Sequence, residues 1–158
     1  MNEKSFKKLT PRAIYAWQWG NAFGNLFYFL IPALYFIFFF NSLNWVIFIA
    51  LCTIVFAGWL ASIVWLPFAQ WKRWRYSIDA NEIDLFYGVL IHKKTLVPMN
   101  RVQHVDTRQG PLLRWYNLSS ITISTAATTH VIPALDETVA ERVRDQIATK
   151  ARLAKDDV

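Results

Sequence analysis

The sequence predicts a membrane protein in which a two-helix transmembrane hairpin precedes an α+β domain, a bent antiparallel sheet with a carboxy-terminal helix. Three observations support this prediction. The stretch 13–71 contains no Asp, Glu, Lys or Arg, the segments after it alternate apolar and polar residues with period two, and the last segment repeats apolar residues every four positions. We expect a basic arm with an interfacial segment over 1–21, the hairpin over 22–71 and the domain over 72–158.

The uncharged stretch is too long for one membrane helix of about 20 residues and suits two. A polar cluster at 41–44 lies near its middle, where a turn between two spans would reach water. We expect spans at 23–40 and 45–65, with a kink near 29–32 because Pro32 removes a backbone donor. The alternative, a buried helical pair in a soluble protein, is disfavoured because the second segment is apolar on all sides.

Small and polar residues predict where the spans interact. Asn21 and Asn25 lie one helical turn apart near the start of the first span, where their amides can bond to headgroups or to the partner helix. The headgroup interpretation is favoured. Gly58 and Ser62 are four residues apart in the second span, a spacing that allows two helices to approach closely. A packing seam is therefore expected there.

The distribution of charge predicts the orientation. Lys and Arg flank both ends of the hairpin and none lies in the connecting turn, so the positive-inside rule places both termini in the cytoplasm. We expect a multi-pass protein of the inner (plasma) membrane, with residues 1–10 as a mobile arm and no cleaved signal peptide. The net charge of +6 divides evenly between the arm and the domain. Such a mild balance predicts the lipid bilayer as partner and no nucleic acid.

The domain is predicted to contain short strands at 74–78, 82–87, 90–97, 101–108, 119–125 and 128–132. Pro133 is expected to close the last strand, since proline cannot donate to a central ladder. Val102 and Val105 are an odd number of residues apart, so the fourth strand is either buried on both faces or bulged near 103–104. Asp136 is placed to cap a final helix, whose apolar stripe at 139, 143 and 147 covers the sheet.

The run Val97-Pro98 through Arg101-Val102-Gln103-His104-Val105-Asp106, continued by 108–114 and by Ile121-Thr122-Ile123-Ser124-Thr125-Ala126, resembles a known family. It is similar to the bacterial pleckstrin-homology-like membrane proteins, the membrane-flanked domain family, and in particular to their short YdbS-like members. The resemblance covers nearly the whole chain and implies a pleckstrin-homology-like domain. It implies a binding or scaffolding role with no catalytic residues, and a larger membrane protein with several copies of the domain as partner.

Two groups of side chains are candidate sites. The polar residues of the fourth strand exceed what core packing needs and are candidates for binding a protein partner, or a second copy of the chain: Arg101, Gln103, His104, Asp106 and Arg108. The basic residues beside the second span and in the third strand are candidates for binding anionic lipid: Lys72, Arg73, Arg75, Lys93 and Lys94. A solvated strand edge and a topology signal, respectively, are the simpler interpretations of the same residues.

Catalysis and cofactors are not expected. The three histidines, at 92, 104 and 130, fall on different predicted strands without metal-ligand spacing, and the only cysteine, Cys52, lies in the second span. No glycine-rich phosphate loop occurs. We therefore predict a non-enzymatic, membrane-anchored interaction module without a cofactor; an anionic-lipid headgroup sensor is the alternative function.

Overall fold

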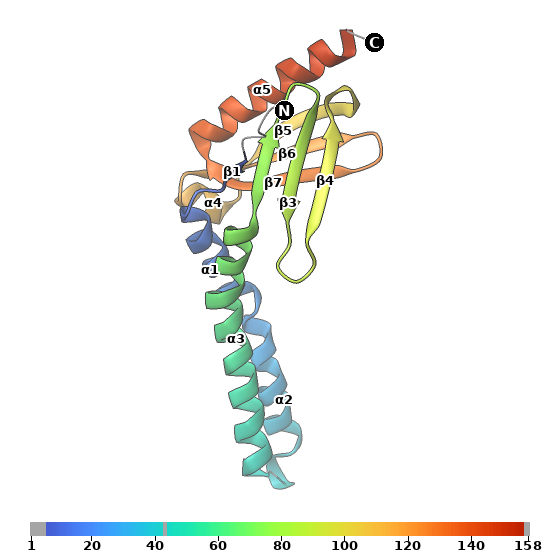
Figure 1. Cartoon of the computed structure of the whole chain (residues 1–158). Coiled ribbons are helices and arrows are strands. Elements are labelled where there is room, and N and C mark those ends of the chain that lie inside the picture. Colours follow the sequence, from blue (N-terminus) through green and yellow to red (C-terminus); the bar gives the residue numbers. More distant parts are fainter. Residues whose placement is uncertain (1–5, 43, 157–158) are drawn as a thin grey trace. The chain divides into compact units, whose positions relative to one another are not determined.

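The computed structural model describes residues 6–42 and 44–156 (Figure 1). The chain separates into two compact units. One consists of Trp17–Phe68, and the other combines the described residues up to Ala16 with those from Ala69 onward. We call them the hairpin and the domain.

The described part of the hairpin consists mainly of helices and is apolar on its surface. The helical elements are α1 (Arg12–Gly24), whose first residues belong to the domain, the 3₁₀ helix η1 (Leu26–Phe29), α2 (Leu30–Phe38), η2 (Phe40–Ser42) and α3 (Trp45–Arg73), whose last residues belong to the domain. Arg12–Phe38 and Trp45–Arg73 are both long and apolar enough to cross a bilayer, and only 6% and 0% of their most apolar windows are buried. A core helix of a soluble protein would be mostly buried. The chain is a membrane protein with a two-helix transmembrane hairpin.

The first span is interrupted earlier than expected. A kink was predicted near 29–32, but the α-helical pattern breaks at η1, between Gly24 and Leu30. Pro32 is the third residue of α2, within its first turn. Proline is tolerated there because the backbone N–H it lacks would have no partner inside the helix. The break thus precedes the proline.

Polar side chains join the two spans. Asn21 Nδ2 donates to the backbone carbonyl of Ser62 at 2.8 Å, and Asn25 Nδ2 donates to Ser62 Oγ at 3.0 Å. The headgroup interpretation of both asparagines was therefore wrong. A Cβ placed on Gly58 would meet nothing within 4 Å, so the expected close approach at that glycine is also wrong. The two spans are joined by hydrogen bonds at Ser62, each of the kind that contributes about 0.6 kcal/mol to helix pairing on average.

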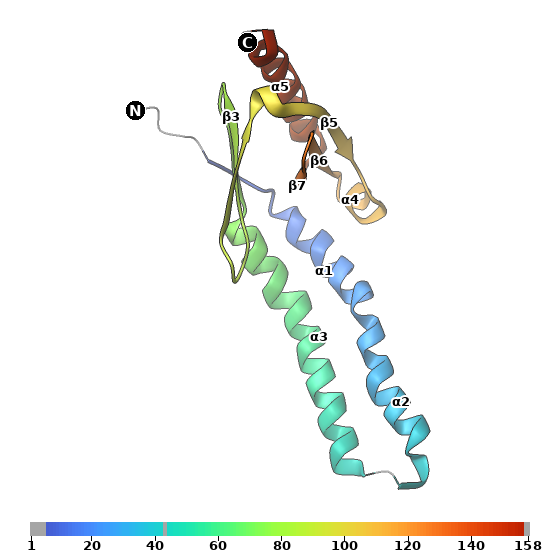
Figure 2. The same cartoon turned by 90° about the vertical axis from the view of Figure 1, so that its right-hand side faces the viewer.

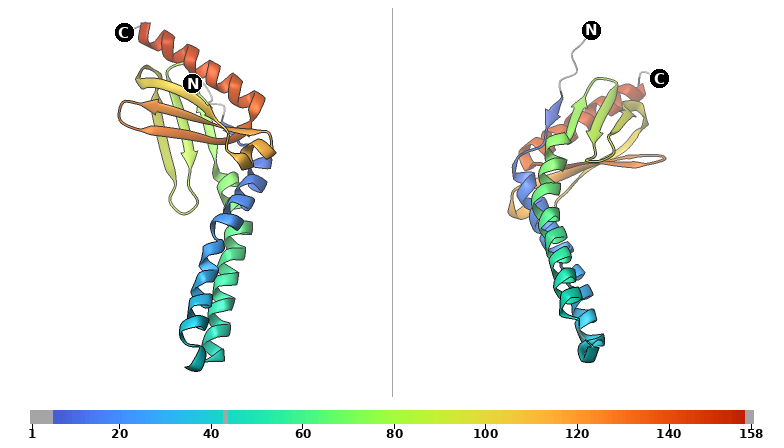
Figure 3. Two further views of the ribbon diagram at one scale, coloured as in Figure 1. Left: turned by 180° about the vertical axis from the view of Figure 1, so that it is seen from behind. Right: turned by 60° about the horizontal axis from the view of Figure 1, so that its bottom comes forward.

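In the described residues, the domain contains two antiparallel sheets and a long helix (Figures 2 and 3). The first sheet has the order β1-β2-β3-β4: Lys7–Lys8, Arg75–Ile78, Glu82–Tyr87 and Lys93–Pro98. The second has the order β5-β6-β7: Val102–Arg108, Leu118–Thr125 and Thr129–Asp136. The 3₁₀ helix η3 (Met99–Arg101) connects the two sheets, α4 (Pro111–Trp115) connects β5 to β6 within the second sheet, and α5 (Glu137–Asp156) ends the described chain. This is the predicted bent sheet with a carboxy-terminal helix.

The core forms where the two sheets and α5 meet. Ile83 of β3 and Ile121 of β6 are fully buried, as is Ile147 on the apolar stripe of α5. Period-two alternation directs one face of each strand inward, and the four-residue period of α5 supplies the third wall. The ammonium of Lys150 donates to the carbonyls of Ile78 and Asp79 at 3.2 and 3.0 Å, which fastens α5 to the turn after β2.

The amino-terminal arm departs from the expectation of an unstructured segment. Lys7 and Lys8 form β1 and pair with Tyr76 and Arg75 of β2, and Leu9 is buried. Trp71 Nε1 donates to the carbonyl of Leu9 at 2.9 Å. Because the arm completes the edge of the first sheet, this part of it belongs to the fold.

Strand boundaries differ in two places. β4 begins at Lys93 instead of residue 90, because 88–92 form a loop after Gly88, whose φ of 111° suits only glycine. β7 continues through Pro133 to Asp136, beside a register shift opposite Ser119–Ile121 that releases the proline from the ladder. The bulge in the fourth strand is confirmed, since the register of β5 shifts between Val102 and His104.

Candidate functional site

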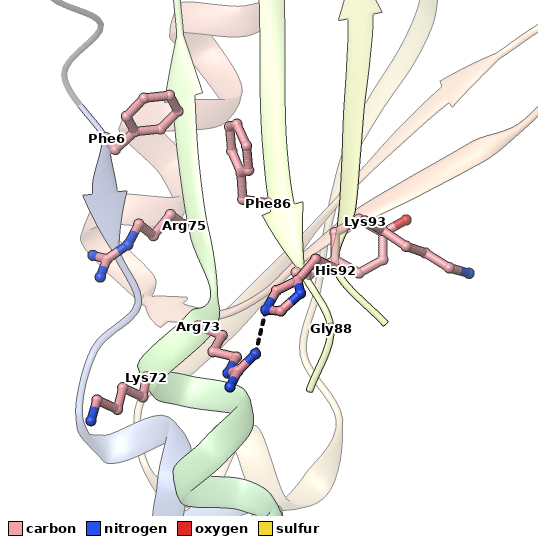
Figure 4. A pocket seen from close by; sticks show the side chains of 9 residues that line it. Phe6, Lys72, Arg73, Arg75, Phe86, Gly88, His92 and Lys93 are labelled. Carbon is pink, nitrogen blue, oxygen red and sulfur yellow. Dashed lines mark hydrogen bonds between the residues drawn. The ribbon is translucent and has the colours of Figure 1, made fainter. Parts of the chain in front are cut away.

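A basic pocket of about 470 Å³ lies between the end of α3, the first sheet and the loop 88–92 (Figure 4). Lys72 and Arg73 come from the last turn of α3, Arg75 from the start of β2, and His92 and Lys93 from the end of the loop and the start of β4. Apolar walls are supplied by Phe6, Phe86 and the ring of Tyr87, with Gly88 at the base of the loop. Four of the five sequence-predicted lipid residues thus line one pocket, with the charged ends of Lys72 and Arg75 on one side of it and that of Lys93 on the other in Figure 4.

The walls and loop of the pocket are fixed by specific contacts. The rings of Phe6 and Phe86 meet edge to face with centroids 5.0 Å apart. Arg73 and His92 share a hydrogen bond between guanidinium and imidazole, drawn as a dashed line in Figure 4. At Gly88 an added Cβ would lie 1.9 Å from the carbonyl oxygen of Ile91, so the loop folds back tightly on its own base.

The charge of the pocket suits an anion. Lys72, Arg73, Arg75 and Lys93 contribute positive charge, and none of the described lining residues is Asp or Glu. Guanidinium groups bind phosphate through paired N–H donors, and ammonium groups add point charges. A phosphate group seated among aromatic walls is the chemistry that these residues support best.

Lys94 lies outside this pocket. It pairs in register with Phe86, and its ammonium sits 5.1 Å from the centroid of that ring. Successive residues of a strand point to opposite faces, which separates Lys94 from Lys93. Arg75, Phe86 and Lys94 pair across neighbouring strands and so share one face of the sheet, which places the charge of Lys94 over the Phe86 wall of the pocket, whereas Lys93 pairs with Tyr87 on the opposite face.

The five sequence-predicted partner residues are all exposed. Arg101 belongs to η3 and Gln103 is the extra residue of the bulge, whereas His104, Asp106 and Arg108 share the outer face of β5. The bulge lets the buried Val102 and the half-buried Val105 lie on one face of β5, which is one of the two arrangements that their odd spacing allowed. Among the described residues β5 pairs with β6 alone, so its other edge is open.

Carboxylates gather at a place that sequence reasoning missed. Oxygens of Asp79, Glu82 and Asp84 lie within 4.8 Å of one another, and Asp84 is fully buried. The alternation of Glu82 and Asp84 on β3, with Asp79 across the turn, is the signal from which this cluster could have been predicted. The three histidines lie apart, in the loop, on β5 and on β7.

Residues 26–151 match the family described as the bacterial PH domain, and the match includes most of the hairpin as well as the domain. The chain belongs to this bacterial PH domain family. Among curated proteins, it is 48% identical over 101 residues to the UPF0699 transmembrane protein YdbS of Bacillus subtilis (strain 168), covering 64% of each chain. It is 27% identical over 94 residues to the UPF0699 transmembrane protein YdbT of the same organism, covering 55% of this chain and 19% of YdbT.

The aligned regions span less than two thirds of either relative. No solved structure matches the chain significantly. The family match confirms the pleckstrin-homology-like membrane protein that the sequence motif indicated. The roles of both candidate surfaces remain predictions.

Proposed function

We propose that this bacterial PH domain protein is a non-enzymatic interaction module of the cell membrane, which displays its domain in the cytoplasm for a protein partner. The open edge of β5 is the observation that carries the proposal. Its backbone is available to an added strand, and the polar side chains of its outer face stand beside that edge. Strand addition draws affinity from main-chain hydrogen bonds and specificity from alternate side chains, so β5 provides both.

The proposed partner is a larger membrane protein that carries the same domain. The segment related to this chain makes up only 19% of YdbT, so a domain of this kind occurs within a much longer transmembrane protein. Two PH-like domains that each present an open strand can extend one sheet across their interface. Pairing of two copies of this chain uses the same chemistry and is the competing outcome.

Co-purification from detergent-solubilised membranes tests the proposal. Asp106→Ala with Arg108→Ala should abolish recovery of the larger PH-domain membrane protein while the melting temperature stays unchanged. Glu141→Ala with Arg152→Ala is the matched control, because it removes one exposed acid and one exposed base from α5. Recovery that is unaffected by the β5 pair would refute the assignment of this strand. Recovery of a differently tagged copy of the chain instead would establish self-association.

The proposed topology places both termini in the cytoplasm. It is supported by the basic residues at the last turn of α3 and at the start of α1, where Arg12 lies. In a chain whose Cys52 is replaced by Ser, a cysteine at Ser42 should react with an impermeant reagent added outside cells. A cysteine at Asp157 should not react, and the reverse pattern would overturn the orientation.

Anionic headgroup binding is a second candidate function, favoured by the basic pocket. Full-length protein in nanodiscs of phosphatidylcholine with phosphatidylglycerol should show slower acetylation of Lys93 than in phosphatidylcholine alone. Lys155, exposed near the end of α5, is the control and should react equally in both. Equal acetylation of Lys93 in the two lipids would exclude this function.

A further inference from the structure

The loop 88–92 presents two large apolar side chains to solvent. Leu90 is 87% exposed and Ile91 73% exposed, and Leu90 is more exposed than any large apolar side chain described in the hairpin. Exposure of this degree on neighbouring residues is uncommon in a domain that has a complete core. Apolar tips of this kind are used to bind an apolar environment.

The conformation of the loop holds this tip outward. Gly88 has a φ of 111°, and the space beside its Cα is filled by the carbonyl oxygen of Ile91. His92 is hydrogen-bonded to Arg73 on the other side of the turn. With both ends of the loop fixed in this way, Leu90 and Ile91 project at its tip.

The contact with Arg73 also connects the loop to the end of α3. Arg73 is the last residue of α3, the helix that is apolar enough to cross a bilayer. Basic residues at the end of such a helix sit at the level of the lipid headgroups. A loop hydrogen-bonded to Arg73 is therefore within reach of the same layer.

Basic side chains surround the apolar tip. Lys93 and Lys94 follow the loop directly and are exposed, and Arg73 and Lys72 line the pocket at its base. An apolar edge with Lys and Arg beside it is the pattern of segments that lie in the membrane interface, where apolar groups enter the acyl boundary and cations meet phosphate. An apolar cleft of a protein partner would require no such surround of cations.

We propose that the loop 88–92 is a membrane-inserting wedge, whose Leu90 and Ile91 enter the interface of an anionic bilayer while the basic pocket takes a lipid phosphate. This inference deepens the second proposed function and rests on it for the phosphate contact. The occupant is the bilayer to which the hairpin already anchors the chain. The wedge restrains the domain against the membrane surface.

Depth-dependent fluorescence quenching tests the wedge. The full chain with Cys52→Ser and Ile91→Cys is labelled with an environment-sensitive fluorophore and reconstituted into phosphatidylcholine vesicles that contain phosphatidylglycerol. We expect emission at shorter wavelength than in water, and quenching by lipids spin-labelled near the headgroup. Leu153→Cys with the same label is the matched control, because Leu153 is an apolar side chain on α5 that is 59% exposed. It should show neither effect.

Two further measurements separate the possible outcomes. Lys93→Gln with Lys94→Gln in the Ile91→Cys chain should reduce the quenching, and so should vesicles of phosphatidylcholine alone. If the label at residue 91 shows the same emission wavelength as the label at residue 153, the proposed wedge is refuted. If Lys93 is nevertheless protected from acetylation by anionic lipid, headgroup binding stands without insertion. If anionic lipid does not protect Lys93 from acetylation either, both the wedge and the proposed headgroup binding are refuted. Quenching that persists unchanged without anionic lipid would refute the role of the cations.

Discussion

Replacing Gly88 with Ala tests the structural basis of the loop directly. The new Cβ would lie 1.9 Å from the carbonyl oxygen of Ile91 and 3.1 Å from its carbonyl carbon. Real Cβ contacts are longer than 3.0 Å, so this carbonyl must move by more than about 1 Å. The φ of 111° adds backbone strain of about 1–3 kcal/mol for a residue with a side chain. The loop is exposed and can relax, which limits the total cost to this range.

A loss of 1 kcal/mol lowers the melting temperature of a small domain by about 4–8 °C. We therefore expect Gly88→Ala to melt at least about 4 °C below the unmodified chain, followed by circular dichroism in detergent. Amides of the loop should exchange faster with deuterium, because the hydrogen bond between Arg73 and His92 is lost.

Gly110→Ala is the matched control for this substitution. Gly110 is exposed and precedes a helix, but its φ is −77° and an added Cβ meets nothing within 4 Å. Alanine lowers the conformational entropy of the unfolded chain, which stabilises the fold, but it also removes a glycine that is favoured at the N-cap of a helix. Because these two effects oppose each other, the free energy of unfolding should change by less than about 1 kcal/mol. If Gly88→Ala and Gly110→Ala melt at the same temperature, the loop is not held by its glycine and the reasoning fails.

Three other predictions test the core and the hairpin. Burial raises the pKa of Tyr76, so the folded state keeps the phenol proton to higher pH than the unfolded chain, and stability should fall above about pH 10 more steeply than in Tyr76→Phe during thermal melts. Val143→Asp places a carboxylate in the buried stripe of α5 at a cost of several kcal/mol, and protease resistance of the domain should be lost while the hairpin stays inserted. A double-mutant cycle of Asn25→Ala and Ser62→Ala should give a coupling of about 0.6–1.7 kcal/mol by unfolding in mixed micelles; additivity would mean that this hydrogen bond contributes nothing to helix pairing.

Most of the fold could be predicted because its signals are local. Period-two alternation located β3, and the odd spacing of Val102 and Val105 allowed two interpretations, of which β5 adopts the bulge. Pro133 misled because proline excludes a strand only where its N–H would face a neighbour, and the register shift beside it removes that demand. Lys7 and Lys8 carry no apolar period, so their pairing with β2 depends on a partner that lies far away in the sequence.

The candidate pocket could be predicted only in part, because it too depends on contacts between residues that lie far apart in the sequence. Lys72, Arg73 and Arg75 were recognisable as a basic cluster beside a span, and Lys93 as a basic residue on a strand. Their meeting depends on the loop 88–92, where the sequence predicted a strand beginning at residue 90. Apolar residues at the tip of a loop imitate a strand in any pattern based on hydropathy. Only the backbone at Gly88 distinguishes the two.

Lys93 is suited to separating two roles of positive charge, the orientation of the hairpin and the binding of anionic lipid. Lys72 and Arg73 adjoin the second span, so their charge also serves to orient the hairpin, and removing it confounds binding with topology. Lys93 lines the same pocket but is separated from the span by two strands and a loop, too far along the chain to dominate the choice of orientation. Lys93→Gln should therefore weaken the response to anionic lipid while cysteine labelling reports an unchanged topology. A change in both would mean that the pocket residues act through orientation alone, which would remove the case for a headgroup site.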